Sequence, residues 1–331
     1  MQISLLRPSL RAWTVSLGIG VLSVTGAVHA QQYPDKPVKI IVPYVAGSPA
    51  DTVARTLGEG LATRLGQPVI VDNKPGANAL IGTREAARAA PDGYTLVIGN
   101  LDTQALNPLL YKQAGYEPTR DFAPVVLVSR PTLLLVARPG LPVNSGAELI
   151  ALAKAQPGKL SYGTWGLGSV AHLWGIQLEQ TAGVDMLHVP FQGSPAAATA
   201  LMGNQIDLMF MSPAQALPSA QQGKLKIIGA TAAQRVKAWE QIPTLSEQGF
   251  RGYEGQTWFG ILAPARTPPE IVERLNRELD AVLKAPETVQ RFAGMAMNPE
   301  GGAPQRLAET LKSSSERWKQ VIAEKKIQLD Q

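Results

Sequence analysis

Four segments rich in serine, glycine and proline each follow a short run of β-branched and apolar residues in this sequence. A serine followed by proline is typical of a helix start, because the hydroxyl accepts a bond from a free backbone N–H and proline fits the first helical position. Free N–H groups and the positive end of the helix dipole together bind anions. The segments therefore favour anion binding, of a carboxylate for example, although helix capping alone explains any single one. They are Gly47-Ser48-Pro49-Ala50-Asp51, Gly163 to Ser169, Gly193-Ser194-Pro195 and Ser212-Pro213.

The spacing within these segments adds two expectations. Residues Ser48 to Asp51 match the Ser-x-x-Asp capping box, which predicts that Asp51 binds backbone N–H groups at its own helix start. Glycines in the loops allow the backbone to approach a ligand closely. Because parallel strands bring their carboxyl ends to one edge of a sheet, the helix starts that follow them are expected to face a common crevice.

Few residues could perform covalent catalysis or hold a metal ion. The chain has no cysteine, which excludes thiolate metal sites and cysteine nucleophiles. His172 and His188 are the two histidines beyond residue 30. We interpret His188, in an apolar run, as a core residue, whereas His172 could face the crevice. The P-loop, Gly-x-Ser-x-Gly and His-Glu-x-x-His motifs do not occur, so we expect no metal and no cofactor.

Residues 166–171, Gly-Leu-Gly-Ser-Val-Ala, match the Gly-x-Gly-x-x-Ala pattern of dinucleotide-binding loops. That function requires an acid about 20 residues further on, at the end of the next strand, to hold a ribose. The next strand ends in Pro190-Phe191-Gln192, and Asp185 precedes it. We therefore interpret the loop as a carboxylate cradle with Trp165 as one pocket wall. An α/β enzyme, a hydrolase or reductase that uses the Gly166 to Ser169 loop, is the alternative.

Short β-branched runs alternate with alanine-rich stretches along the chain. This pattern is typical of βαβ units, and it predicts an α/β fold in which mostly parallel sheets are flanked by helices. Helices are expected up to Leu65, from about Gly82 to Ala90, and over residues 147–155, 272–283 and 304–327. Two series of strands are expected, over residues 38–42, 69–71 and 95–99, and then 133–136, 160–162, 187–189, 206–210 and 226–229.

The first 30 residues have the composition of a secretory signal peptide. They contain Arg7 and Arg11 but no acid, then an apolar stretch over residues 12–24, then small residues up to Ala30. The apolar stretch is shorter than the roughly 20 residues of a membrane-spanning helix. We expect cleavage after Ala30, and the next residue, Gln31, offers no thiol for a lipid anchor.

Size and charge set further bounds. Removing 30 of the 331 residues leaves 301, which is enough for two packed cores. The formal net charge of +5 falls to +3 when Arg7 and Arg11 are removed, and the other basic residues are scattered among acids. This distribution does not favour nucleic-acid binding.

Several blocks of the sequence stand out together: residues 33–43 (YPDKPVKIIVP), 71–77 (VDNKPGA), 90–96 (APDGYTL), Asn107-Pro108 with Leu110-Tyr111, Arg120-Asp121-Phe122, and 258–264 (WFGILAP). In this order, over essentially the whole mature chain, they resemble the Bug receptors of the tripartite tricarboxylate transporter system. The resemblance implies a two-lobed, type II-like periplasmic binding protein fold. It also implies a non-enzymatic receptor of the periplasm that carries a small organic carboxylate to a membrane permease, and we expect a monomer.

The resemblance further implies the lobe boundaries and the binding residues. Residues 31–130 plus 256–331 form the first lobe and residues 131–255 the second, with hinges near Arg130 and Gly255. The ligand-binding residues carried over are Tyr44, Ala46, Gly47, Ser48, Asp51 and Thr103 in the first lobe, and Thr164, Trp165, Gly168, Ser169, His172, Met211 and Ser212 in the second.

Two positions depart from the family pattern. The first loop usually reads Pro-Pro-Gly-Gly after the aromatic residue, and here it reads Val45-Ala46-Gly47-Ser48. Members that hold an amino-acid ammonium carry an aspartate after the second-lobe strand, where this chain has Met211. A buried ammonium without an anionic partner is unfavourable, so we expect non-amino carboxylates to bind better than their amino counterparts.

Overall fold

The computed structural model describes residues 1–2 and 33–324, and residues 33–324 lie within one compact unit. Residues 3–30 of the predicted signal peptide, the predicted cleavage site and the predicted end of the last helix at Ile327 lie outside the described residues. Within the described part of the chain, no helix is both long enough and apolar enough to cross a membrane.

Five strands form the first sheet, in the order β2-β1-β3-β10-β4. Strand β1 (Val38–Val42) pairs in parallel with β2 (Val69–Asn73) and with β3 (Thr95–Asn100). Strand β10 (Phe259–Pro264) lies antiparallel between β3 and β4 (Phe122–Ser129). Four strands therefore run in one direction, and β10 alone is reversed within this sheet.

The second sheet repeats this arrangement, in the order β7-β6-β8-β5-β9. Strand β6 (Ser161–Thr164) pairs in parallel with β7 (Leu187–Pro190) and β8 (Leu208–Met211). Strand β5 (Leu134–Ala137) lies antiparallel between β8 and β9 (Lys226–Ala230). Each sheet with its helices forms one lobe of a two-lobed α/β fold, so the predicted fold class and the mostly parallel sheets are confirmed.

Strands β4 and β10 were not among the strands expected from the sequence. All six residues of β10 are buried, and most of β4 is buried as well, so neither strand shows the alternation that marks a half-exposed strand. A run buried on both faces is not distinguishable by periodicity from a buried helix segment. Pairing of β10 with β3, far away in the sequence, is a tertiary event.

Alternate residues of the central strands enter different cores. In β1, Val38, Ile40 and Val42 belong to one hydrophobic cluster, and Ile41 belongs to another on the opposite face of the sheet. The second sheet is divided in the same way, because Leu134 and Leu135 of β5 enter separate clusters. Both sheets are thus buried on two faces, as expected for βαβ units.

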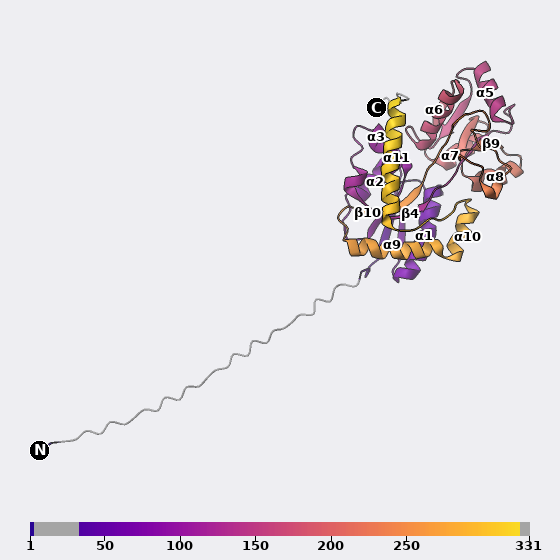
Figure 1. The fold of residues 1–331 in the computed structure, drawn as a ribbon. Helices are drawn as coiled ribbons and strands as arrows, with labels where there is room; N and C mark the ends of the chain where they lie inside the picture. The colour runs from indigo at the N-terminus through magenta and orange to yellow at the C-terminus, as the bar shows by residue number, and fades with distance from the viewer. Residues whose placement is uncertain (3–32, 325–331) are drawn as a thin grey trace. The chain divides into compact units, whose positions relative to one another are not determined.

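Helices provide the other half of each core, as the ribbon shows (Figure 1). The first sheet is covered on one face by α1 (Pro49–Leu65), α9 (Pro269–Lys284) and α10 (Pro286–Gly294), and on the other by α2 (Leu80–Ala87), the π-helix η1 (Asp102–Leu106) and α11 (Pro304–Glu324). The second sheet is covered by α5 (Gly146–Ala155) and α6 (Val170–Ala182) on one face, and by α7 (Ser194–Met202) and α8 (Pro213–Gln221) on the other. Shorter helical turns are α3 (Asn107–Leu110), α4 (Pro118–Asp121) and η2 (Lys237–Trp239).

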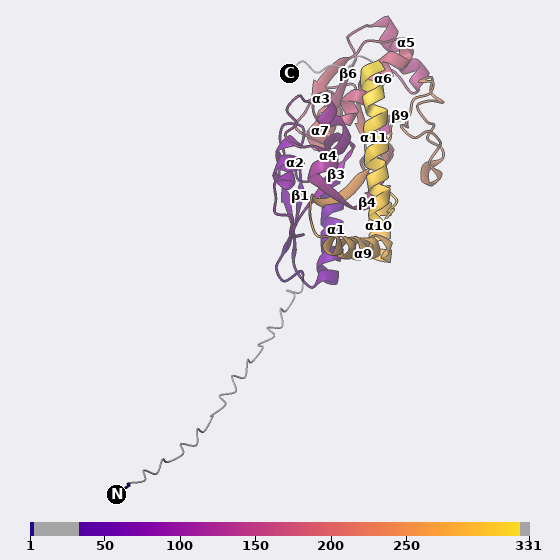
Figure 2. The ribbon, with the colours of Figure 1, turned by 60° about the vertical axis from the view of Figure 1, so that its left-hand side comes forward.

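The chain crosses between the sheets twice, after β4 and before β10. The Leu133 N–H donates to Thr231 Oγ1 (3.1 Å), and the Thr231 N–H donates to the Leu133 carbonyl (2.9 Å). The Gly255 N–H in turn donates to the Thr231 carbonyl (2.8 Å), so the two crossing segments lie side by side. After β10 the chain stays with the first sheet, and α11 packs along β4 (Figure 2), as predicted for a helix on the surface of one lobe.

Candidate functional site

A cavity of about 80 Å³ lies between the two lobes. Tyr44 and Ser48, which follow β1, and Asn100, at the end of β3, line it from the first lobe. Met211, at the end of β8, and Trp165, which follows β6, line it from the second lobe. The carboxyl ends of parallel strands from both sheets therefore meet at one cavity, where ligands of open α/β sheets bind.

The predicted binding residues divide into two groups by this cavity. Tyr44, Ser48, Trp165, Met211 and Ser212 line the cavity, whereas Ala46, Gly47, Asp51, Thr103, Thr164, Gly168, Ser169 and His172 do not. Several lining residues were not predicted, namely Asn100, Asp102, Val170, Gln215 and Phe259. The predicted loops thus reach the cavity, but many of their side chains hold the loops instead of facing a ligand.

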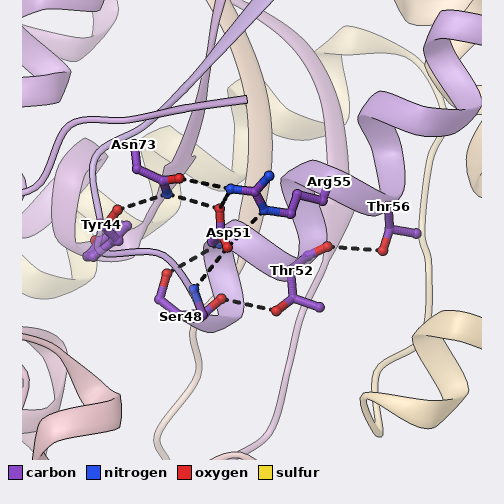
Figure 3. A network of polar contacts seen from close by, with 8 residues as sticks. Tyr44, Ser48, Asp51, Thr52, Arg55, Thr56 and Asn73 are labelled. Atoms are coloured by element: carbon purple, nitrogen blue, oxygen red, sulfur yellow. Dashed lines mark hydrogen bonds and ion pairs between the residues drawn. The ribbon is translucent and has the colours of Figure 1, made fainter. Parts of the chain in front are cut away.

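Asp51 illustrates the second group (Figure 3). Its carboxylate accepts bonds from the Gly47 N–H (2.9 Å) and from Asn73 Nδ2 (2.9 Å), and it forms an ion pair with Arg55 (2.9 Å). Burial alone would raise the pKa of Asp51, but the donors Arg55, Gly47 and Asn73 outweigh burial and hold the pKa below its ordinary value. The Ser48 hydroxyl accepts from the Asp51 N–H (3.3 Å), as a capping box requires. Asp51 therefore fixes the loop between β1 and α1.

The four predicted helix starts differ in how they are capped. Ser48 caps α1 through its hydroxyl, as predicted, and Ser169 caps α6 in the same way although no proline follows it. At α7 the prediction is wrong, because Gly193 is the cap residue and Ser194 is already the first helical residue. At α8, Ser212 is the cap residue, but its hydroxyl donates to Gln215 Oε1 (3.3 Å) and caps no backbone N–H. The first N–H groups of a helix have no acceptor within the helix, so α7 and α8 offer donors beside the cavity.

Asp102 is the most informative residue that sequence reasoning missed. It stands at the start of η1, just after β3, and only 1% of its surface is exposed. Its carboxylate accepts from two donors of the second lobe, the Val170 N–H (2.6 Å) and Trp165 Nε1 (3.0 Å). Burial raises the pKa of Asp102 to about 6, although these donors favour the charged form. A first-lobe carboxylate thus occupies the N-terminus of α6 in the second lobe.

A short network of hydrogen bonds supports Asp102 from its own lobe. Asn100 Nδ2 donates to the Tyr44 hydroxyl (2.7 Å). The hydroxyl proton has two acceptors within reach, Asn100 Oδ1 (2.9 Å) and, more weakly, Asp102 Oδ2 (3.4 Å). Thr103 fixes Asn100, because the Thr103 N–H donates to Asn100 Oδ1 (3.1 Å) and the Asn100 N–H donates to Thr103 Oγ1 (3.1 Å). Burial raises the pKa of Tyr44 well above its ordinary value, so the hydroxyl stays protonated. Thr103 therefore positions a lining residue and does not itself line the cavity.

His172 packs behind the loop that begins α6 and does not line the cavity. Its Nδ1 accepts from the Gly168 N–H (3.1 Å), and its ring stacks on that of His188 at 3.9 Å between centroids. His188 Nε2 lies 2.7 Å from Thr164 Oγ1. Burial lowers the pKa of His172 to about 4, and burial together with His172 lowers the pKa of His188 to about 4. The pair is neutral at pH 7 and supports the loop.

The same loop contacts the first lobe at a second point. The Tyr111 hydroxyl donates to the Leu167 carbonyl (2.8 Å). Trp165 lines both the cavity and a larger groove that is lined from both lobes. Within the described residues, no group of three or more His, Cys, Asp or Glu side chains could hold a metal ion.

Comparison with known proteins places this geometry in a family. The model of the tripartite tricarboxylate transporter family receptor matches residues 53–327. A UPF0065 protein from the tcbD-tcbE intergenic region of Pseudomonas sp. (strain P51) is 33% identical, over 96% of this chain and 95% of its own length. The protein BugT of Bordetella pertussis is 30% identical, over 94% of this chain and 95% of its own length.

Solved structures agree with these relatives. A Rhodopseudomonas palustris protein with adipate has a TM-score of 0.86 at 32% identity, covering 89% of this chain and 99% of the other. The periplasmic binding protein BugD has a TM-score of 0.84 at 34% identity, with coverage of 89% and 99%. MatC from Rhodopseudomonas palustris with bound malate has a TM-score of 0.82 at 32% identity, with coverage of 88% and 100%. The resemblance to Bug receptors is confirmed, and the chain belongs to the receptor family of the tripartite tricarboxylate transporters.

Proposed function

We propose that the protein is an extracytoplasmic solute receptor that binds a small carboxylate-bearing metabolite between its lobes and delivers it, chemically unchanged, to the membrane permease of a tripartite tricarboxylate transporter. The observation that carries this proposal is the cavity itself, which is lined from both lobes by the starts of α1, α7 and α8. Relatives of the same fold have been solved with adipate and with malate.

Backbone groups are the anion-binding elements in this proposal. None of the residues that line the cavity in the described part of the chain is Lys, Arg or His. Ser48, Ser194 and Ser212 line the cavity at the starts of α1, α7 and α8, where free N–H groups and the helix dipole favour a negative charge. Phe210, Met211 and other apolar side chains would hold the body of the ligand.

Binding would proceed by closure of the lobes. We propose residues 31–130 plus 256–331 as one lobe and 131–255 as the other, with the adjacent crossing segments near Arg130 and Gly255 as the hinge. Arg130 pairs with Glu300 (2.6 Å) and donates to Thr310 Oγ1 (2.9 Å), which supports the C-terminal segment as part of the first lobe. Closure brings Tyr111 against the Leu167 carbonyl and joins the two lobes.

For the enzyme alternative, a hydrolase or reductase that uses the Gly166 to Ser169 loop, the position of Asp102 disfavours a reductase that binds a dinucleotide there. The Gly166 to Ser169 loop would have to bind a pyrophosphate at the N-terminus of α6, where the Asp102 carboxylate already accepts from the Val170 N–H. Two anions at one helix start repel each other. We therefore propose a receptor without enzymatic activity and without a cofactor, which acts as a monomer in the periplasm after cleavage behind Ala30.

The binding proposal is tested by mass spectrometry of small molecules that co-purify with the protein, followed by calorimetric titration of the acid found. Val45→Trp is expected to abolish binding, because Val45 lines the cavity and the indole would fill it. Val289→Trp, on the exposed surface of α10, is the matched control and is expected to bind normally. Recovery of a changed molecule after prolonged incubation would establish an enzyme instead.

The export proposal is tested separately by N-terminal sequencing of protein from the periplasmic fraction. We expect the sequence to begin at Gln31. Full-length protein in the membrane fraction would overturn the proposed cleavage, without affecting the binding proposal.

A further inference from the structure

Asp102 contributes a negative charge to the cavity, and no cation of residues 33–324 lines the cavity beside that charge. Among the lining residues of the described chain, Asp102 and Tyr44 are the ionisable ones, and Tyr44 stays protonated. The donors to Asp102 are the Val170 N–H, Trp165 Nε1 and, weakly, the Tyr44 hydroxyl, all of which are neutral. Asp51 differs, because Arg55 neutralises it outside the cavity.

Asp102 also occupies one anion-binding position, the N-terminus of α6, which is therefore closed to a ligand. The N-terminus of α6 is directed at the Asp102 carboxylate through the Val170 N–H at 2.6 Å. The other helix starts at the cavity belong to α1, α7 and α8, and Ser194 and Ser212 mark the two in the second lobe. Around them the cavity is lined by large apolar side chains, including Phe210, Met211 and Phe259. The cavity thus combines neutral donors at three helix starts, large apolar side chains and one carboxylate of the protein, Asp102.

A second ligand carboxylate would meet two costs at once. It would lose its hydration in an apolar space without a cation, and it would be repelled by the charged Asp102 in a medium of low dielectric constant. A neutral hydroxyl in the same place would avoid both costs, since it could donate to a free lone pair of Asp102.

We propose that Asp102 is a specificity-determining residue that acts as an internal anion at the start of α6 and restricts the cavity to ligands with a single carboxylate. This inference rests on the proposed receptor function. It separates this chain from the relatives solved with adipate and with malate, which are both dicarboxylates. The preferred ligand is a monocarboxylate whose other end carries a hydroxyl or an ammonium that can bond Asp102. The expectation from Met211 that an ammonium would find no anionic partner in the cavity is not met, because Asp102 lines it.

The test compares matched probes by calorimetric titration at pH 8, where Asp102 and all the probes are ionised. The pairs are adipate with 6-hydroxyhexanoate, and malate with 3-hydroxybutyrate, so that each pair differs in one carboxylate. We expect the monocarboxylate to bind the unaltered protein at least tenfold more tightly in at least one pair. In Asp102→Asn the ratio of monocarboxylate affinity to dicarboxylate affinity is expected to fall at least tenfold, chiefly because the dicarboxylate binds better.

Asp207→Asn is the control for the change of net charge. Asp207 pairs with Arg138 (2.7 Å) and bonds the Ser161 N–H (2.8 Å) at the end of β8 opposite Met211. In Asp207→Asn the ratio of monocarboxylate affinity to dicarboxylate affinity is expected to stay within twofold of that of the unaltered protein. If the unaltered protein binds the dicarboxylate more tightly in both pairs, the inference is overturned, even if Asp102→Asn does not fold. An equal change of the affinity ratio in Asp102→Asn and Asp207→Asn would overturn it as well. Absence of binding by every probe, with the protein folded, would count against the proposed function instead.

Discussion

Two carboxylates of the first lobe, Asp51 and Asp102, occupy similar positions in the chain but have opposite electrostatic environments. Each follows a parallel strand of one sheet, and each accepts a backbone N–H at a helix start. Asp51 serves the loop before its own helix α1, and Arg55 lies beside it. Asp102 accepts from helix α6 of the other lobe, and its hydrogen-bond donors within residues 33–324 are all neutral. The pKa is accordingly lowered for Asp51 and raised to about 6 for Asp102.

This contrast teaches that the partner, and not the position after a strand, decides what a buried carboxylate does. An acid that is bonded within its own lobe stabilises that lobe alone. An acid that bonds the other lobe links the two lobes, and its charge acts on anything bound between them. The stability and the pH dependence of variants at these positions test this difference.

The largest expected difference is in stability. Asp51→Asn is expected to lower the free energy of unfolding by about 2 kcal/mol, because it weakens the bonds to Arg55, Asn73 and the Gly47 N–H. Asp102→Asn is expected to lower it by less than about 1 kcal/mol at pH 8, or to raise it, because the amide has no charge to desolvate. Urea unfolding of both variants measures the difference. A larger loss in Asp102→Asn would show that the bridge between the lobes stabilises the protein more than the loop network does.

The second prediction concerns pH. The folded pKa of Asp102, about 6, lies above its unfolded value of 3.8, so its contribution to stability is lost as the pH rises from about 4 through 6. The folded pKa values of His172 and His188, about 4, lie below the unfolded value of 6.5, so their contribution is lost as the pH falls from 6.5 towards 4. The two effects oppose each other in the same range.

Asp102→Asn removes the contribution of Asp102 to the pH dependence of stability and leaves that of the two histidines. Stability is then expected to fall more steeply on acidification from pH 6.5 to pH 4 than in the unaltered protein. His188→Gln removes part of the contribution of the two histidines and is expected to make that fall shallower. Unfolding free energies measured at several pH values in this range decide the matter, and an identical pH profile in all three proteins would show that none of these groups titrates abnormally.

The smallest expected effect separates two serines at helix starts. Ser48→Ala is expected to cost about 1 kcal/mol of stability, because the hydroxyl caps α1 by accepting the Asp51 N–H. Ser212→Ala is expected to cost less than about 0.5 kcal/mol, because its hydroxyl bonds the Gln215 side chain and no backbone N–H. Thermal unfolding of the two variants, without any carboxylate ligand added, is the measurement. Equal losses would mean that Ser212 also caps its helix in solution.

Much of the architecture was predictable from local patterns. The alternation of β-branched and alanine-rich stretches indicated the α/β class, and nearly all the predicted strands and helices are present within a few residues of their expected bounds. The cap at Ser48 followed from the Ser-Pro pair and the capping box. Local preferences and hydrophobic periodicity act over a few residues, and therefore they can be read directly from the sequence.

The tertiary structure alone decided which side chains face the cavity. A helix start directs its N–H groups at whatever the fold places in front of it, and at α6 that is Asp102, 68 residues earlier in the chain. His172 could have faced the cavity on the evidence of its spacing from Ser169, but stacking on His188 of β7 turns it behind the loop. The reversed strands β5 and β10 likewise pair with distant partners. Such contacts depend on how whole elements pack, and the residue types by themselves carry no record of that packing.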